Sequence, residues 1–380
     1  MKYLFVCNTY YQLIVAIQLK YTLLNKAEIT LVMSDHSNNS YEYYKNLKAL
    51  KYFDDIIFVN TKKYDNPLNF FSKIISNLSV LFCYAPELCK FKKRYFDEIV
   101  FFNSDKFNVT LFSYLTKFNP NIKSSRIEES VLSYNENDLK EHSNYNYRQS
   151  IQSRVYKITN VYRKLLKKRY FNDQISSLYC FYPSLYKGNL KTIQIPYVNT
   201  EDINFVKLLK RIFDINDEFL TFKEKYIYFS SIGDFEGGEC VGEFELAKKI
   251  ENIVWKKNLL IKSHPRDYRH LYENNNFKVC RYSNVPWEVL MCCFDFSKHV
   301  FLTNISSSVL SLNMCLKNGP RTIFLYNFCK NDGNFILRGP KIDLEDLLIT
   351  LHKDNRFSRF IVPKNWKEFE LFLTHDVNVN

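Results

Sequence analysis

The stretch LLIKSHPRDY, residues 259–268, places a histidine and basic side chains directly after a short apolar run. Lys262 and Ser263 precede His264, and Pro265 follows it. One interpretation is a turn, in which the proline ends a strand and the polar residues face water. The other is an anion site at the carboxyl end of a parallel strand, where open α/β sheets bind ligands. Both interpretations require a strand that ends just before His264.

Hydroxyl-bearing residues follow two further strand-like runs: Ser306, Ser307 and Ser308 after VFLTNI, and Ser230 and Ser231, with Gly233 close behind, after KYIYF. Serines that open a helix offer hydroxyls and unpaired backbone N–H groups to a phosphate, and the helix dipole adds to the attraction. The same serines can equally be ordinary N-caps.

Three carboxylates have positions that suit a sugar substrate. Glu288 lies in the first turn of a helix that begins at VPWEVL, where it can complement the helix dipole or accept hydrogen bonds from ribose hydroxyls. Glu128 and Glu129 end a strand in RIEES. Such a pair is either two ordinary solvent-exposed carboxylates or the source of a general base for a hydroxyl nucleophile.

The elements that must position these residues alternate between strand and helix. In the first half, strands are expected at 3–7, 27–34, 54–60, 97–103 and 123–129, and in the second half at 225–231, 258–263, 299–304 and 321–327. Alternation of this kind predicts an open, mostly parallel α/β sheet in each half. We therefore expect an N-terminal domain over 1–190, a linker over 191–222 and a C-terminal domain over 223–380.

Composition narrows the classes of function. The 380 residues carry a formal net charge of +13, which favours an acidic partner such as nucleic acid, anionic lipid or a phosphorylated small molecule. The ten cysteines lack disulfide spacing and no CxxC pair occurs, so a reducing cytoplasm is expected and a zinc site is not. No GxGxxG or P-loop motif occurs, and no apolar run is long enough to span a membrane. Residues 154–171 predict a basic amphipathic helix, which either packs on a core or docks on a membrane surface.

In their order along the chain, EES at 128–130, the His264-Pro265 pair and the serines at 306–308 resemble the three motifs of bacterial sialyltransferases with two Rossmann-like domains. FVCNTYYQL and VPWEVL are also similar to glycosyltransferase family 52, the lipooligosaccharide sialyltransferases. The resemblance spans roughly residues 1 to 330 and departs from the family at Ser130, where the motif has glycine. It implies an α/β fold of the GT-B type, with two Rossmann-like domains facing a central cleft.

The resemblance also implies roles. Glu129, or less favourably Glu128, would deprotonate the acceptor hydroxyl, and His264 would stabilise or protonate the departing phosphate of CMP. Ser307 and Ser308 would bind that phosphate. The other residues expected at the donor site are Ser306, Glu288, Lys262, Pro265, Ser231 and Gly233. A nucleoside monophosphate leaving group needs no divalent cation, so neither a metal nor another cofactor is expected.

The function so implied is an inverting transfer of sialic acid from CMP-sialic acid to a terminal galactose of a lipooligosaccharide or capsular glycan. The enzyme would be cytoplasmic or peripheral on the inner face of the plasma membrane, with a homodimer as one option and no nucleic-acid partner. Two alternatives stay open: a GT-B glycosyltransferase with another nucleotide-sugar donor, and a non-catalytic basic protein that binds nucleic acid or anionic lipid.

Overall fold

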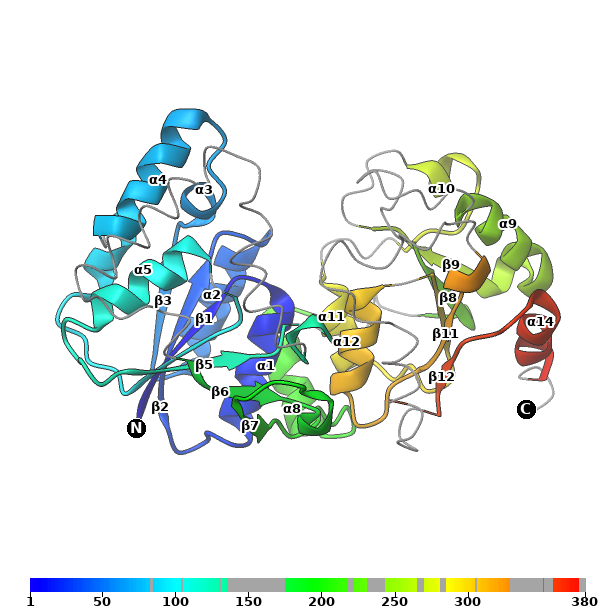
Figure 1. Cartoon of the computed structure of the whole chain (residues 1–380). Coiled ribbons are helices and arrows are strands. Elements are labelled where there is room, and N and C mark those ends of the chain that lie inside the picture. The colour runs from blue at the N-terminus through cyan, green and yellow to red at the C-terminus, as the bar shows by residue number, and fades with distance from the viewer. Residues whose placement is uncertain are drawn as a thin grey trace. The chain divides into compact units, whose positions relative to one another are not determined.

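A computed structural model of the chain describes residues 1–82, 85–103, 105–129, 131–134, 175–216, 222–230, 243–264, 270–280, 285–304, 306–328, 351 and 358–375. The chain divides into two compact units. The first comprises Met1–Val198 and Arg211–Asp214, and the second comprises Asn199–Lys210 and Ile215–Asn380. Each unit has its own parallel sheet with helices on both faces (Figure 1).

The sheet of the first unit has seven strands in the order β3-β2-β1-β4-β5-β6-β7, and all its pairings are parallel. Its strands are β1 (Lys2–Cys7), β2 (Glu28–Ser34), β3 (Asp55–Val59), β4 (Glu98–Phe101), β5 (Lys123–Ile127), β6 (Ile175–Cys180) and β7 (Lys191–Gln194). Strands such as YLFVC are continuous apolar runs because helices cover both faces of a parallel sheet. The order reverses beside β1, which is the place where such sheets bind ligands.

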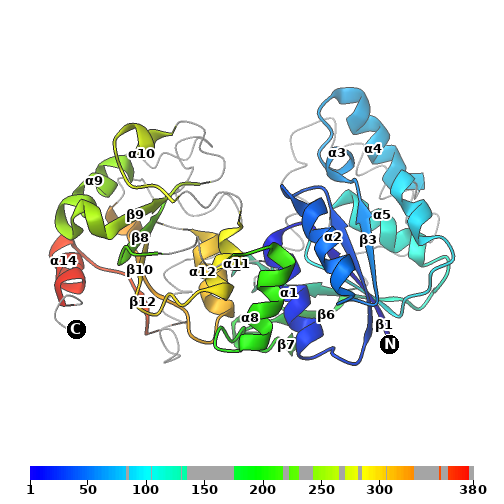
Figure 2. The same ribbon diagram turned by 180° about the vertical axis from the view of Figure 1, so that it is seen from behind.

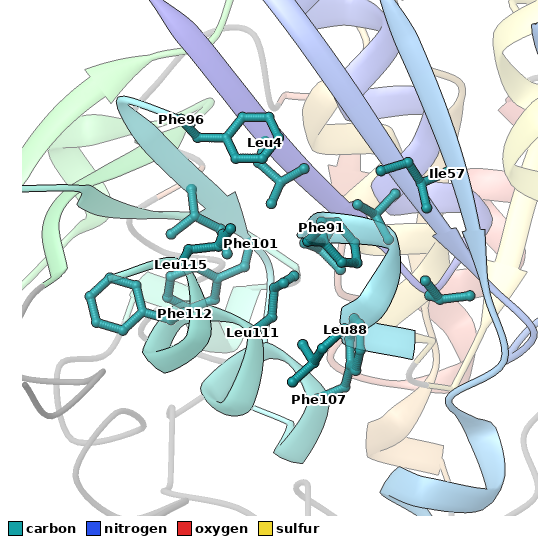
Figure 3. Packing of buried hydrophobic residues seen from close by; sticks show 14 of the residues in the cluster. Leu4, Ile57, Leu88, Phe91, Phe96, Phe101, Phe107, Leu111, Phe112 and Leu115 are labelled. Atoms are coloured by element: carbon teal, nitrogen blue, oxygen red, sulfur yellow. The ribbon is translucent and has the colours of Figure 1, made fainter. Parts of the chain in front are cut away.

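Helices α1 (Tyr10–Tyr21) and α2 (Ser40–Leu50) cover one face of this sheet. The opposite face carries α3 (Lys62–Asp65), α4 (Phe70–Phe82) and α5 (Lys106–Leu115), as Figures 1 and 2 show from two sides. Figure 3 shows the core under α5 and the short 3-10 helix Pro86–Phe91, where Phe91, Phe107 and Leu111 pack with Leu4 and Phe101 of the strands. This core packs against β1, β3 and β4 and fixes the positions of their carboxyl ends relative to one another.

The sheet of the second unit has five parallel strands in the order β12-β11-β10-β8-β9. They are β8 (Tyr226–Phe229), β9 (Leu259–Lys262), β10 (Val300–Thr303), β11 (Arg321–Phe324) and β12 (Phe360–Ile361). Its described helices are α8 (Ile203–Phe213), whose last residues belong to the first unit, α9 (Glu243–Val254), α10 (Leu271–Asn274), α11 (Trp287–Cys293), α12 (Ser307–Cys315) and α14 (Trp366–His375). One face packs on α9 and α14, and Figure 1 shows α11 and α12 on the other.

The two parallel α/β sheets predicted from the sequence are confirmed, and every predicted strand overlaps an observed one, with bounds that differ by at most three residues. Three strands are additional, and one of them is the short β12 at the edge of the second sheet. β6 and β7 extend the first sheet beyond β5, and β7 occupies the start of the segment expected to be a linker. The predicted basic helix at 154–171 lies outside the described residues. No disulfide joins the described cysteines, of which Cys7, Cys180 and Cys292 are buried.

Candidate functional site

His264 follows the carboxyl end of β9, as the sequence predicts. β9 ends at Lys262, and the backbone N–H of His264 donates a hydrogen bond to Ser230 Oγ at 3.2 Å, which ties the end of β9 to the end of β8. The Lys262 ammonium group donates a hydrogen bond to the backbone carbonyl of the next residue, Ser263, at 3.0 Å. Ser263 Oγ is buried and has no hydrogen-bond partner among the described residues. Pro265 and the residues up to 269 lie outside them, as do Ser231 and Gly233.

The serine motif lies at the neighbouring strand on the other side of β8. Ser306 is the N-cap of α12, and its hydroxyl accepts from the backbone N–H of Val309 at 3.4 Å. Ser307 and Ser308 are the first two residues of this nine-residue helix. β8 separates β9 from β10, so these two strands lie about 10 Å apart and end at the same end of the parallel sheet. His264 follows one of them, and the start of α12 follows the other.

Lys262 and Glu288 form an opposite-charge pair beside this edge. Glu288 lies in the first turn of α11, as predicted, and burial raises its pKa although Lys262 opposes the shift. Burial lowers the pKa of Lys262, and the neighbouring Cys280 and Glu288 counter this shift. Each of the two charges thus stabilises the other in an environment from which water is partly excluded.

In the first unit, Glu128 is a buried carboxyl with three hydrogen-bond donors. Only 2% of the residue is exposed. It accepts from the Tyr11 hydroxyl at 3.1 Å, from the Phe181 backbone N–H at 2.8 Å and from the Tyr134 hydroxyl. Burial raises its pKa to about 7 against the opposing effect of these donors. Glu128 therefore holds β5, α1 and the end of β6 together.

Glu129 has a different environment. Its Oε1 accepts from Gln12 Nε2 at 2.7 Å, and its backbone N–H donates to Ser133 Oγ at 2.9 Å. The side-chain oxygen of Gln12 accepts from the N–H groups of Asn8 and Thr9, and with Thr9 as N-cap it completes a capping box at the start of α1. The first turn of α1 thus fixes the position of the Glu129 carboxylate.

A polar network that the sequence reasoning missed extends from here along the carboxyl ends of β1, β2 and β4. Asp105, the N-cap of α5, accepts from Asn8 Nδ2 at 2.7 Å, and Ser34 Oγ donates to Asn8 Oδ1 at 2.7 Å. His36 Nδ1 lies 2.9 Å from Ser34 Oγ, and its Nε2 lies 3.4 Å from Asp65 Oδ2. The signal was a polar residue directly after each strand, as in CN, SDH and FFNSD.

Burial determines the charge of this network. It raises the pKa of Asp65 to about 6. It also raises the pKa of Asp105 well above its usual value, with the like charges of Asp65 and Glu129 adding to the effect. Burial also lowers the pKa of His36, with Lys62 adding to the shift and Asp35 opposing it. Among the described residues no group of three metal-ligating side chains has the geometry to hold a metal ion. The network thus contains two carboxyls, Asp65 and Asp105, whose ionisation is disfavoured by burial.

A cavity of about 360 Å³ opens next to this network, between the end of β3 and α4. Its walls include Thr61, Tyr64, Ser76 and Phe107, and Lys63 and Glu87 lie at its border. The backbone N–H of Phe107 also donates to Asp65 at 2.9 Å. This size is at the lower end of small-molecule sites, which are about 300–1,000 Å³.

No protein-family model and no curated protein matches the sequence. Solved structures do match the fold. The UDP-GlcNAc 2-epimerase of Methanocaldococcus jannaschii, in complex with UDP-GlcNAc and UDP, has a TM-score of 0.53 at 12% identity, over 100% of this chain and 94% of that one. The fold is of the GT-B type.

Two other solved structures match with lower TM-scores. The GT-B domain of a sialyltransferase from Photobacterium damselae has a TM-score of 0.48 at 11% identity, covering 95% of this chain and 100% of that one. MurG of Acinetobacter baumannii has 0.39 at 10% identity, covering 99% and 91%. Of the described residues, no helix is long and apolar enough to cross a membrane.

Proposed function

We propose that the protein is a glycosyltransferase that uses a nucleotide sugar as its donor, and that this donor is CMP-sialic acid. The observation that carries the proposal is the shared sheet edge of His264 and the start of α12, on the two strands that flank β8. Imidazole, serine hydroxyls and a helix N-terminus are the groups that hold a phosphate without a metal.

The donor side follows from this edge. Ser307 and Ser308 bind the phosphate of CMP at the N-terminus of α12, and His264 donates a hydrogen bond to the phosphate oxygen that leaves the sugar. Glu288 accepts from the ribose hydroxyls, and Lys262 supplies positive charge. Ser306 contributes by capping α12, which fixes the direction of the helix N–H groups. Ser231, Gly233 and Pro265 complete the donor site in this proposal.

The acceptor side assigns different tasks to the two adjacent glutamates. Glu128 is saturated by three donors and buried, so it is a positioning residue. Glu129 is only partly buried and its carboxylate is oriented by Gln12, so we assign it as the general base. The cavity at Tyr64 and Phe107 accepts part of the acceptor glycan, for which we propose a terminal galactose.

The proposed step is a direct displacement. Glu129 takes the proton of the acceptor hydroxyl, and the acceptor oxygen forms a bond to the anomeric carbon of sialic acid. The bond from that carbon to the phosphate oxygen breaks with its electron pair, and CMP leaves. One displacement inverts the donor from β to α, through an oxocarbenium-like transition state.

The test is CMP release from CMP-sialic acid with a galactoside acceptor. The turnover of His264→Ala and that of Glu129→Gln are each expected to be roughly 10²–10⁴-fold lower than that of wild type. The matched controls, His270→Ala and Glu42→Gln, replace exposed residues on α10 and α2 and are expected to keep it. Full activity in both site variants would overturn the residue assignment.

A second candidate is an enzyme acting on a UDP-sugar, as the name of the M. jannaschii structure suggests. Thermal stabilisation by CMP, CDP, UDP and GDP separates the two, because stabilisation grows with affinity. Stabilisation by CMP and CDP alone supports the sialyltransferase. Stabilisation by UDP alone favours the second candidate.

A further inference from the structure

The surface of α4 shows an inverted distribution of polar and apolar side chains. Phe71, Ile75, Leu78 and Phe82 recur at spacings of four, three and four residues, which places them on one face of the helix. They are 76%, 64%, 40% and 68% exposed. Ser76, in contrast, is 3% exposed and points inward. The helix therefore presents its apolar face outward, the reverse of an ordinary surface helix.

The contacts of the polar face explain why α4 is held this way round. Ser76 Oγ donates to the carbonyl of Tyr64 at 2.7 Å, and it accepts from Lys106 Nζ at 3.0 Å. Asn69 binds the first turn, accepting from the Ser72 N–H at 2.8 Å. These hydrogen bonds fix the rotation of α4 about its axis, so its apolar face stays outside.

Exposed apolar side chains are also found where the helix begins. Leu68, two residues before α4, is 92% exposed, and Phe70, its first residue, is 56% exposed. Six large exposed apolar side chains on one short segment are more than the scattered exposed residues of an ordinary surface. Such an accumulation is typical of a surface that binds a partner.

The segment that contains α4 is basic, which indicates the kind of partner this face binds, although Arg94 within it pairs with Asp55. Residues 61–94 contain seven basic side chains: Lys62, Lys63, Lys73, Lys90, Lys92, Lys93 and Arg94. The same stretch has two acidic residues. Asp65 is one, and its Oδ2 is buried, while the other, Glu87, pairs with Lys90. An apolar helical face among lysines complements the surface of an anionic bilayer, where lysines meet head groups and aromatic side chains enter the acyl boundary.

We infer that α4 docks the first unit on an anionic membrane surface, with Phe71, Ile75 and Phe82 inserted at the head-group level. The helix has 13 residues, so it lies in the interface rather than crossing the bilayer. This inference goes beyond the proposed reaction, although Ser72, Ile75 and Ser76 of α4 also line the cavity proposed for the acceptor. It would bring the cavity at Ser72, Ile75 and Ser76 next to lipid-linked acceptors.

The experiment is sedimentation of the full chain with vesicles, without nucleotide or glycan, so that its outcome is independent of the proposed catalysis. Wild type is expected to bind vesicles of phosphatidylglycerol and phosphatidylcholine, and to bind pure phosphatidylcholine at least about tenfold more weakly. The triple variant Phe71→Gln/Ile75→Gln/Phe82→Gln is expected to partition at least about tenfold less than wild type.

The matched control replaces three exposed apolar residues away from α4, in Leu23→Gln/Ile203→Gln/Leu371→Gln, and is expected to bind as wild type does. Circular dichroism and Tm check the fold of both triple variants. Should the α4 variant misfold, Phe71→Trp reports directly, because insertion shifts the emission of the introduced tryptophan to shorter wavelength and lets brominated lipids quench it.

Three outcomes would overturn the inference. One is equal binding of neutral and anionic vesicles, and another is vesicle binding by the α4 variant equal to that of wild type. The third is a wild type that binds no vesicles but dimerises in light scattering, while the α4 variant is monomeric. That result would assign the face to a second copy of the chain.

Discussion

Gln12 Nε2 lies 2.7 Å from Oε1 of Glu129, and the other end of the same amide accepts from the backbone N–H groups that begin α1. One buried side chain therefore has two roles, helix cap and orienting partner of the proposed base. Substitutions that separate these roles test whether the orientation matters for catalysis.

The first prediction compares Gln12→Glu with Gln12→Met. Glutamate at this position keeps the capping box, since Glu and Gln both serve there, but replaces the donor to Glu129 by a second carboxylate. Like charge disfavours ionisation, so the acidic limb of the pH–rate profile is expected to move to higher pH. Methionine removes both interactions and is expected to lower Tm as well. An unshifted profile in Gln12→Glu would contradict the orienting role.

The second prediction concerns the pH dependence of stability through Glu128. Its pKa is about 7 in the folded chain against 4.5 ordinarily, because burial disfavours the charged form. The folded state binds this proton more tightly than the unfolded state. The stabilisation is therefore full below pH 4.5 and is lost as pH rises to about 7.

Glu128→Gln mimics the protonated carboxyl and removes this dependence. Relative to wild type, its free energy of unfolding is expected to rise by up to about 3 kcal/mol as pH goes from 4.5 to 7. Glu128→Ala is expected to lose roughly 1–3 kcal/mol because it leaves three donors without their acceptor. Denaturant titrations across this pH range measure both, and parallel curves for wild type and Glu128→Gln would refute the prediction.

A third prediction separates the cap of α12 from its anion site. Ser306→Ala removes the side-chain acceptor of the Val309 N–H and is expected to cost about 1 kcal/mol of stability. Ser306→Asp and Ser306→Asn both keep a good cap. Only the aspartate adds a negative charge where the phosphate is expected, so only it should abolish stabilisation by CMP. Equal CMP binding by these two variants would place the phosphate elsewhere.

The fourth prediction uses Lys262 and Glu288 as a double-mutant cycle. Lys262→Met leaves the Glu288 carboxylate without its positive neighbour and is expected to destabilise the fold by about 1–3 kcal/mol at pH 8. The loss should shrink at pH 5, where Glu288 can take up a proton. Adding Glu288→Gln is expected to recover most of it, without restoring CMP binding. Additive losses measured by urea unfolding would show that the two charges do not interact.

Sequence patterns were enough to predict the strands that consist of continuous buried apolar residues, and the polar residues directly after them. Lys262, His264, Glu288 and Ser306 lie where expected because a strand end or first helical turn determines each position. β6 and β7 were not predicted because ISSLYC and KTIQ lack a continuous apolar run.

The network of Asp105, Asn8 and His36 escaped for a different reason. Its members belong to the ends of β4, β1 and β2, far apart in sequence, and only the order of the strands brings them together. α4 shows a third kind of failure. Periodicity places Phe71 and Ile75 on one helical face, but only the hydrogen bonds of Ser76 reveal that this face points outward.

The position of β1 in the middle of its sheet constrains synthesis of the chain. β1 pairs with β2 on one side and with β4 on the other, so Tyr3 meets Glu98 only after all the intervening residues have been made. At 5–20 residues per second the ribosome needs roughly 5–20 s for that interval. Throughout it the nascent chain carries an apolar strand with one unsatisfied edge, which is the kind of segment that chaperones bind.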